Sequence, residues 1–312
     1  MRRRSGFRAG LGAILAGFLA MAATGPALAQ SRDNYPFFFN PFGTEPTRAK
    51  PAHPKPQYRK PLRAKPAHAE PARVKPAHAK PAPAEEPAVL TPIALQTPAA
   101  LPPDVAYGRF IALIRADLAM GDELVKRRDW ELAHRHFMFP LEEIYGVIRS
   151  DLHAYKTPAF DGALRSLAST VAARRAKSYP KALASVEKAL AAADANLRMR
   201  QSDWPRFVLQ VSIATLKTAP EEYDDALEDG RFVHSIGYQT ARGIVIATQQ
   251  MLDGVAVELG VKNPDAFREL QDGMAELRAA FPTVNAPKEP AVDAAAMSAT
   301  VAKVETAARK LM

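Results

Sequence analysis

The chain of 312 residues contains no cysteine. This absence excludes disulfides, thiolate catalysis, cysteine-ligated zinc, iron–sulfur clusters and the usual covalent attachment of haem. The sequence also lacks His-Glu-x-x-His, Gly-x-Ser-x-Gly and a glycine-rich phosphate loop. Only four of the seven histidines follow residue 101, and no Ser/His/Asp set can be assembled among them. These absences favour a non-enzymatic protein whose core is stable without covalent cross-links.

The first 29 residues have the pattern of a cleavable signal peptide. Four arginines precede an apolar run from Ala9 to Ala23, and Ala27-Leu28-Ala29 forms a small-x-small cleavage site. The apolar run of about 15 residues is short for a membrane span, which needs about 20. We therefore expect a periplasmic or otherwise exported protein with no transmembrane span in the mature chain. An uncleaved membrane anchor is the alternative.

Residues 30–101 combine a short aromatic segment with a low-complexity region rich in Pro, Ala and Lys. The tetrapeptide Lys-Pro-Ala-His occurs three times, beginning at Lys50, Lys65 and Lys75. Proline fixes φ and removes hydrogen-bond donors, so we expect a disordered, extended linker. Its cations are suited to an anionic envelope surface, and its aromatic segment to a protein partner. Loose metal binding by the three linker histidines is the alternative to a solvated spacer.

The net charge of +9 is unevenly distributed. Residues 30–100 carry 11 basic and 5 acidic side chains, whereas residues 101–312 carry 27 basic and 28 acidic ones. The C-terminal part is therefore nearly neutral, and we expect no basic face on it. Nucleic-acid binding is not expected from such a domain.

Apolar residues recur at helical spacing from residue 102 to the end of the chain. No alternating strand pattern competes with this spacing. The sequence predicts an all-α fold, an up-and-down helical bundle over residues 102–284 followed by an alanine-rich C-terminal helix over residues 285–312. The individual helices are expected at about 104–128, 129–155 with a kink or restart at Pro140, from 157, from 178, from 203, 220–230, 234–259, from 263 and over the C-terminal segment.

Two polar patches interrupt the apolar helices, one around His136 and one between Glu221 and Tyr238. His136 and Glu143 share a helix face about 10.5 Å apart, so a metal site there needs ligands from another helix. Carboxylates and imidazoles on facing helices suit iron, manganese or zinc. The predicted metal ligands are His136, Glu143, Glu222, Asp225 and His234. In the alternative, the acids stabilise helix N-termini in solvent and the histidines are hydrogen-bonded packing residues.

Each patch also contains its own set of spaced residues, and the two sets together form one pattern. In the first patch these are Ala133, His136, Pro140, Glu143 and Tyr145, and in the second Glu222, Tyr223, Ala226, Asp229, Gly230, Tyr238, Gln239, Ala241, Arg242 and Gly243. This pattern resembles exported all-helical domains of proteobacteria that are associated with high-affinity iron permeases. Phe139 and Gly237 depart from it, because the pattern has His and Glu there. The chain is also loosely similar to imelysin-like iron-uptake proteins, although it lacks their His-x-x-Glu motif.

The resemblance implies an exported, non-enzymatic helical binding protein of the cell envelope. It implies binding of a divalent metal such as iron, or another role in iron acquisition. The alternative is a structural or tethering envelope protein that uses its cationic proline-rich linker and has no metal site.

Overall fold

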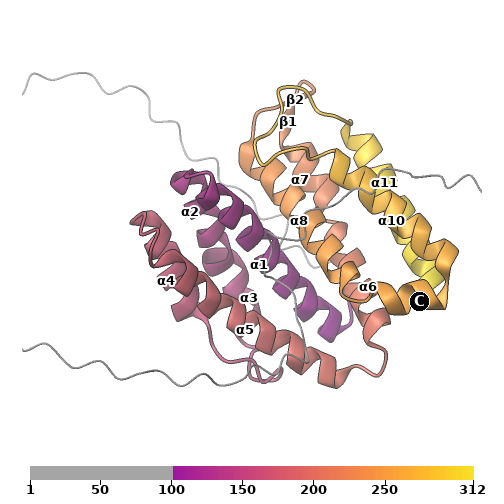
Figure 1. Cartoon of the computed structure of the whole chain (residues 1–312), viewed down its shortest axis with the longest axis horizontal. Helices are drawn as coiled ribbons and strands as arrows, with labels where there is room; N and C mark the ends of the chain where they lie inside the picture. The colour runs from indigo at the N-terminus through magenta and orange to yellow at the C-terminus, as the bar shows by residue number, and fades with distance from the viewer. Residues whose placement is uncertain (1–100) are drawn as a thin grey trace, which may run out of the picture. The chain divides into compact units, whose positions relative to one another are not determined.

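The computed structural model describes residues 101–312, which are helical apart from one short hairpin and the connecting loops (Figure 1). The predicted all-α fold and helical bundle are confirmed for these residues. The predicted signal peptide and linker lie outside the described part of the chain.

The helices before residue 201 form one antiparallel group. In this group α2 packs against α1, and α4 packs against both α2 and α5. Aspartate caps the first turn of α2, because the Asp129 carboxylate accepts a hydrogen bond from the backbone N–H of Leu132. The members are α1 (Pro103–Lys126), α2 (Trp130–Phe139), the π-helical turn η2 (Pro140–Ile144), α3 (Tyr145–Ile148), α4 (Asp161–Ala172) and α5 (Tyr179–Arg200).

The remaining helices form a second group around α8, which packs against α6, α7 and α10. The C-terminal helix α11 is part of this core, since it packs against α10, α7 and α6 and buries Met297, Val301 and Val304. The elements are α6 (Trp204–Leu216), α7 (Ala219–Asp225), β1 (Leu227–Glu228), β2 (Arg231–Phe232), α8 (Ser235–Asp253), α9 (Ala256–Lys262), α10 (Pro264–Ala279) and α11 (Ala294–Leu311).

Helix α1 joins the two groups, because it packs against α8 and α6 as well as α2 (Figure 1). The approach of α8 is close: a Cβ added to Gly243 would lie 2.6 Å from the carbonyl oxygen of Ala116. On another face of α1, a Cβ added to Gly121 would lie 2.5 Å from the ring of Phe137. Glycine at both positions therefore lets neighbouring helices approach the α1 backbone.

Three helix predictions were wrong in their extent. The helix expected over 129–155 passes through η2 at Pro140 and ends at Ile148. Proline has no N–H to continue the α-helical ladder, and the N–H of Tyr145 bonds back to the Pro140 carbonyl five residues earlier. The helix expected over 234–259 is divided into α8 and α9, which meet at a 67° bend. The helix expected over 220–230 ends at Asp225, and a hairpin follows that pairs Leu227 with Phe232. Its two-residue turn is Asp229-Gly230, where both residues have positive φ, and Asp-Gly is a hairpin signal that the helical interpretation of this segment missed.

Two threonines have the sequence context of helix caps, Thr157 before Pro158 and Thr218 three residues before Glu221, but both are used in tertiary contacts instead. The hydroxyl of Thr157 accepts a hydrogen bond of 2.8 Å from Tyr107, and α4 begins only at Asp161. The hydroxyl of Thr218 accepts a hydrogen bond of 2.9 Å from Arg109. Both donors lie on α1, so contacts distant in sequence override the local capping preference at these threonines.

No single helix within residues 101–312 is long and apolar enough to cross a bilayer. The bent pair α8–α9 meets the length and composition requirement, and α8 lies largely in the core.

Candidate functional site

A buried hydrogen-bond network joins α1, α2 and α8 at the point where the two groups of helices meet. His136 on α2 is 1% exposed, and its Nδ1 atom lies 3.0 Å from Oδ1 of Asp117 on α1. Its Nε2 atom lies 3.0 Å from Oε1 of Gln239 on α8. The Gln239 amide nitrogen in turn donates to the carbonyl of Val284 at 3.2 Å. Each buried polar group of the network therefore has a partner, as burial demands.

The network fixes where protons lie. Because the Gln239 amide nitrogen donates to Val284, its oxygen faces His136 and accepts, so Nε2 of His136 carries a proton. A second proton lies between Nδ1 of His136 and the Asp117 carboxyl. Burial raises the pKa of Asp117, and the hydrogen bond and charge of His136 oppose that rise. Burial therefore favours the protonated form of the Asp117 carboxyl more than exposure to water would.

Further polar bonds cross the same boundary. Arg242 on α8 binds Glu123 on α1 through Nη1 and Oε2, 2.5 Å apart, and both side chains are largely buried. Near the start of α1, the Nε atom of Arg109 donates to the backbone carbonyl of Ala214 at 3.2 Å. Such bonds have strict geometry, so they favour one arrangement of the two helix groups over alternatives that satisfy apolar burial equally well.

Three predicted metal ligands are carboxylates, of which one lies in η2 and two lie on α7. Glu143 lies in η2 and is half-buried, Glu222 lies on α7 and is half-buried, and Asp225 is exposed at the end of α7. Among residues 101–312, no three His, Asp or Glu side chains form a group that could hold a metal ion. The structure therefore does not bring the five predicted ligands together as one such group.

The two predicted histidine ligands have different surroundings. Both ring nitrogens of His136 are engaged in the buried network, so a metal ion would have to displace Asp117 or Gln239. His234 is exposed just before α8, with Nε2 3.4 Å from Oε1 of Glu228 in the hairpin. The assignment of all five residues as metal ligands stays a prediction.

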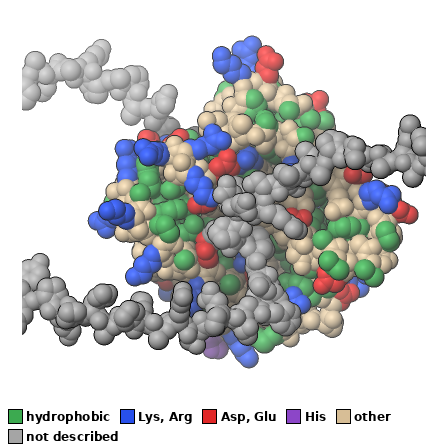
Figure 2. Space-filling model, viewed as in Figure 1, with side chains coloured by type: hydrophobic (Ala, Val, Ile, Leu, Met, Phe, Trp, Pro, Cys, Tyr) green, Lys and Arg blue, Asp and Glu red, His purple; other side chains and the backbone are tan. Residues whose placement is uncertain are grey.

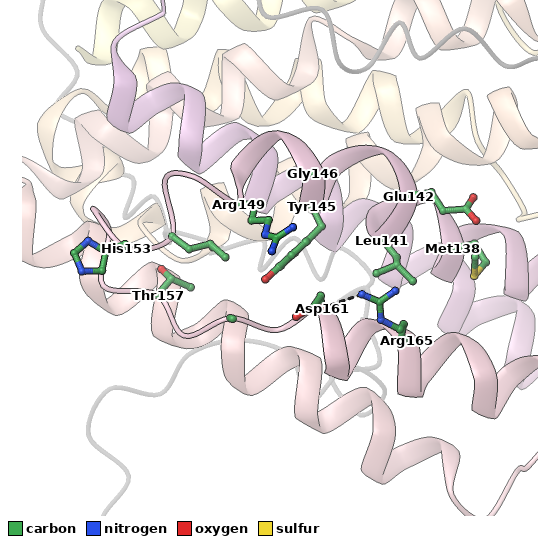
Figure 3. Close-up of a pocket in the computed structure, with 12 residues that line it drawn as sticks. Met138, Leu141, Glu142, Tyr145, Gly146, Arg149, His153, Thr157, Asp161 and Arg165 are labelled. Carbon is green, nitrogen blue, oxygen red and sulfur yellow. Dashed lines mark hydrogen bonds and ion pairs between the residues drawn. The ribbon is translucent and has the colours of Figure 1, made fainter.

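The first helix group also contains a pocket of about 830 Å³ between η2, α3 and the start of α4 (Figure 3). Its volume falls within the range of small-molecule sites. The Tyr145 ring forms one wall and packs edge-on against Phe160, with ring centroids 5.0 Å apart. Arg165 and Asp161 form an ion pair of 2.9 Å at the rim, and the hydrogen bond from Arg165 lowers the pKa of Asp161. The lining combines apolar side chains with charges of both signs.

Part of the chain is similar to a known family. Residues 198–312 match the iron permease-associated 4-helix bundle domain. The match begins at the end of α5, and the longest helices within it are α6, α8, α10 and α11. The association with iron permeases suggested by the two patches is thereby supported, whereas the imelysin-like similarity stays a prediction. No curated protein and no solved structure matches the chain.

The buried network crosses the boundary of the matched domain. Gln239 and Arg242 lie inside it, whereas their partners His136 and Glu123 precede residue 198. The helices α1 and α2 are therefore attached to the matched region by specific polar bonds as well as by apolar packing.

Several residues of the pattern in the second patch contribute to packing between helices. Tyr223 and Tyr238 are fully buried, and their hydroxyls donate to the carbonyls of Val292 and Thr283 at 2.7 and 2.8 Å. The two tyrosines thereby hold the connection between α10 and α11 against α7 and α8. The departure at Gly237 has a steric reason, because a Cβ there would lie 2.9 Å from the carbonyl oxygen of Glu222.

Asp117, the partner of His136, is not among the residues predicted from the sequence to form a site. The feature of the sequence that could have identified Asp117 is an acidic residue within an apolar helix, between Ala116 and Leu118, which are both buried. A charged residue at such a position needs a buried partner. That partner lies 19 residues away on another helix, and nothing in the spacing identifies it.

Proposed function

We propose that this chain is an exported, non-enzymatic helical protein of the cell envelope that serves iron acquisition as the partner of an iron permease. The match of residues 198–312 to an iron permease-associated domain carries the proposal. The signal-peptide pattern of residues 1–29 supports the envelope location, since it predicts export.

The structure suggests how the two parts of the chain cooperate. The matched domain supplies α6 to α11, and α1 lies against it along α8 and α6. The bonds of Arg242 and Gln239 hold the preceding helices at a fixed position on this domain. In our proposal the matched domain contacts the permease, and the attached helices present a second surface whose position relative to the permease is therefore defined.

Iron uptake by cells tests the proposal. Cells that lack the chain are expected to take up radioactive iron more slowly under iron limitation, and the intact chain is expected to restore the rate. Manganese uptake serves as the control for general damage to the envelope. In detergent-solubilised membranes, the tagged chain is expected to copurify with the permease. Unchanged iron uptake together with no copurification would contradict the proposal, and a defect in envelope integrity alone would favour the tethering alternative.

Direct binding of iron or another divalent metal is the finer form of this proposal. The candidate ligands remain His136, Glu143, Glu222, Asp225 and His234, and metal content of the purified protein is the measurement. His234→Ala is the sharper variant, because His234 is exposed and its loss leaves the buried network intact. Equal metal content in wild-type protein and in this variant would remove His234 from the ligand set.

A further inference from the structure

The turn between α1 and α2 and the turn between α4 and α5 lie at the same end of the first helix group. Tyr179, the first residue of α5, donates a hydrogen bond of 2.8 Å to Asp122 in the last turns of α1. The ring of Tyr179 also packs against that of Phe137 on α2, with centroids 6.0 Å apart. Two segments about 50 residues apart in sequence therefore form one surface.

This surface, called the basic end below, carries seven exposed cations: Lys126, Arg127, Arg128, Arg174, Arg175, Lys177 and Lys181. Lys126 and Arg127 are paired with acids one turn earlier in α1. Among residues 101–312, no carboxylate forms an ion pair with the other five. Their charge is therefore available to a partner outside the chain.

Two of these arginines occupy backbone positions that usually favour glycine. Arg128 has φ 65° and Arg174 has φ 51°, directly after the ends of α1 and α4. The left-handed conformation suits glycine at a helix end. Cations near a helix C-terminus also interact favourably with its dipole, but that effect is confined to one turn and does not account for Lys181 in the first turn of α5.

The expectation that this part of the chain has no basic face was therefore wrong. Residues 101–200 hold 16 Lys and Arg against 12 Asp and Glu, whereas residues 201–312 hold 11 against 16. The two halves thus have opposite net charge, and the near-neutral total conceals it. Figure 2 shows Lys and Arg side chains gathered on the side where Figure 1 draws α2 and α4.

We propose that the basic end binds an anionic phospholipid surface. Its cations project from two neighbouring turns, as contact with a surface of many distributed charges requires. Trp130, which is half-exposed in the first turn of α2, lies beside them and is a residue type that favours the membrane–water interface. The inference rests on the proposed function, because a permease partner places the chain beside a bilayer.

Vesicle binding by the full chain tests this inference. Unilamellar vesicles contain phosphatidylglycerol and phosphatidylcholine in equal parts, or phosphatidylcholine alone, in about 0.1 M salt, where the Debye length is about 10 Å. Each basic side chain near an anionic surface raises partitioning about fivefold, so Arg174→Ala/Arg175→Ala is expected to lower it about 25-fold. The control Arg206→Ala/Lys288→Ala removes the same charge from exposed positions outside the basic end and is expected to change partitioning by less than about threefold.

Comparison of the two double variants isolates the contribution of the basic end to vesicle binding, because residues 30–100 and their cations are the same in both proteins. Equal losses in the two double variants, equal binding to both kinds of vesicle, or no binding of the wild-type chain would overturn the inference. If the basic end instead binds an acidic protein, the wild-type chain is expected not to bind the vesicles. Vesicle binding that depends on Arg174 and Arg175 in a chain without effect on iron uptake would leave the inference standing while the proposed function fails.

Discussion

Removal of His136 tests whether the buried network holds the two helix groups together. In His136→Leu, the Asp117 carboxyl stays buried without its hydrogen-bond partner, and Oε1 of Gln239 also loses its donor. Breaking a buried pair in this way costs about 3–5 kcal/mol. The whole free energy of unfolding of a domain is about 5–15 kcal/mol. We therefore expect His136→Leu to remove a large part of the stability of this domain.

Asp117→Asn provides the contrasting variant. The asparagine amide can donate to Nδ1 of His136 while Nε2 still donates to Gln239, so the hydrogen bonds of the network persist with neutral groups. We expect this change to cost less than about 1.5 kcal/mol, the net value of a typical hydrogen bond. Added to His136→Leu, it should restore about 1–2 kcal/mol, because an unpartnered buried amide costs less than an unpartnered buried carboxyl.

Urea unfolding at pH 7, followed by far-ultraviolet circular dichroism and extrapolated linearly to zero denaturant, measures these differences. His153→Leu is the matched control, because His153 is exposed, and it should change the free energy of unfolding by less than about 0.5 kcal/mol. A cost below about 1 kcal/mol for His136→Leu, or equal costs for His136→Leu and Asp117→Asn, would refute the role assigned to the network.

Three further predictions concern other parts of the fold. Burial and the charge of Asp122 raise the pKa of Glu187 from 4.5 to about 7. Because the unfolded chain releases this proton at lower pH than the folded chain, the free energy of unfolding falls as pH rises from about 4.5 to 7. In urea titrations, Glu187→Gln should therefore add about 1–2 kcal/mol at pH 8, after allowance for solvent contact, and almost nothing at pH 4. Tyr238→Phe removes a hydrogen bond to the connection between α10 and α11, and should cost about 1 kcal/mol and speed amide exchange there. Gly243→Val, which meets the carbonyl of Ala116, should lower the melting temperature by more than about 8 °C, whereas no change would mean that α1 and α8 can separate at low cost.

The local sequence identified the helices and many of their ends. Apolar residues at 3.6-residue spacing predicted the helical class, and Asp203 and Asn263 do cap the first turns of α6 and α10. These features depend on residues within one or two turns of each other. The sequence therefore contains all that is needed to predict them.

Local pattern failed where a distant residue competed with a neighbour. Thr157 and Thr218 have the sequence context of caps, yet each is a partner of a side chain on α1. At both positions the tertiary contact outweighs a capping preference of about 1 kcal/mol. The division of the helix expected over 234–259 has a local cause instead, because Gly254 is the C-cap residue of α8.

The sequence alone determined that the chain from residue 102 onward folds mainly into helices, that it has no disulfide, and that His136 lies in a polar patch between apolar segments. Only the tertiary structure decided that His136 meets Asp117 and Gln239, which lie 19 and 103 residues away in the sequence. It also decided that cations from two separate turns share one end of the helix group. The physical reason is that helical periodicity specifies which face of each helix is buried, whereas the choice of facing helix depends on close packing, such as that of Gly243 against Ala116, and on pairing of buried polar groups across the whole chain.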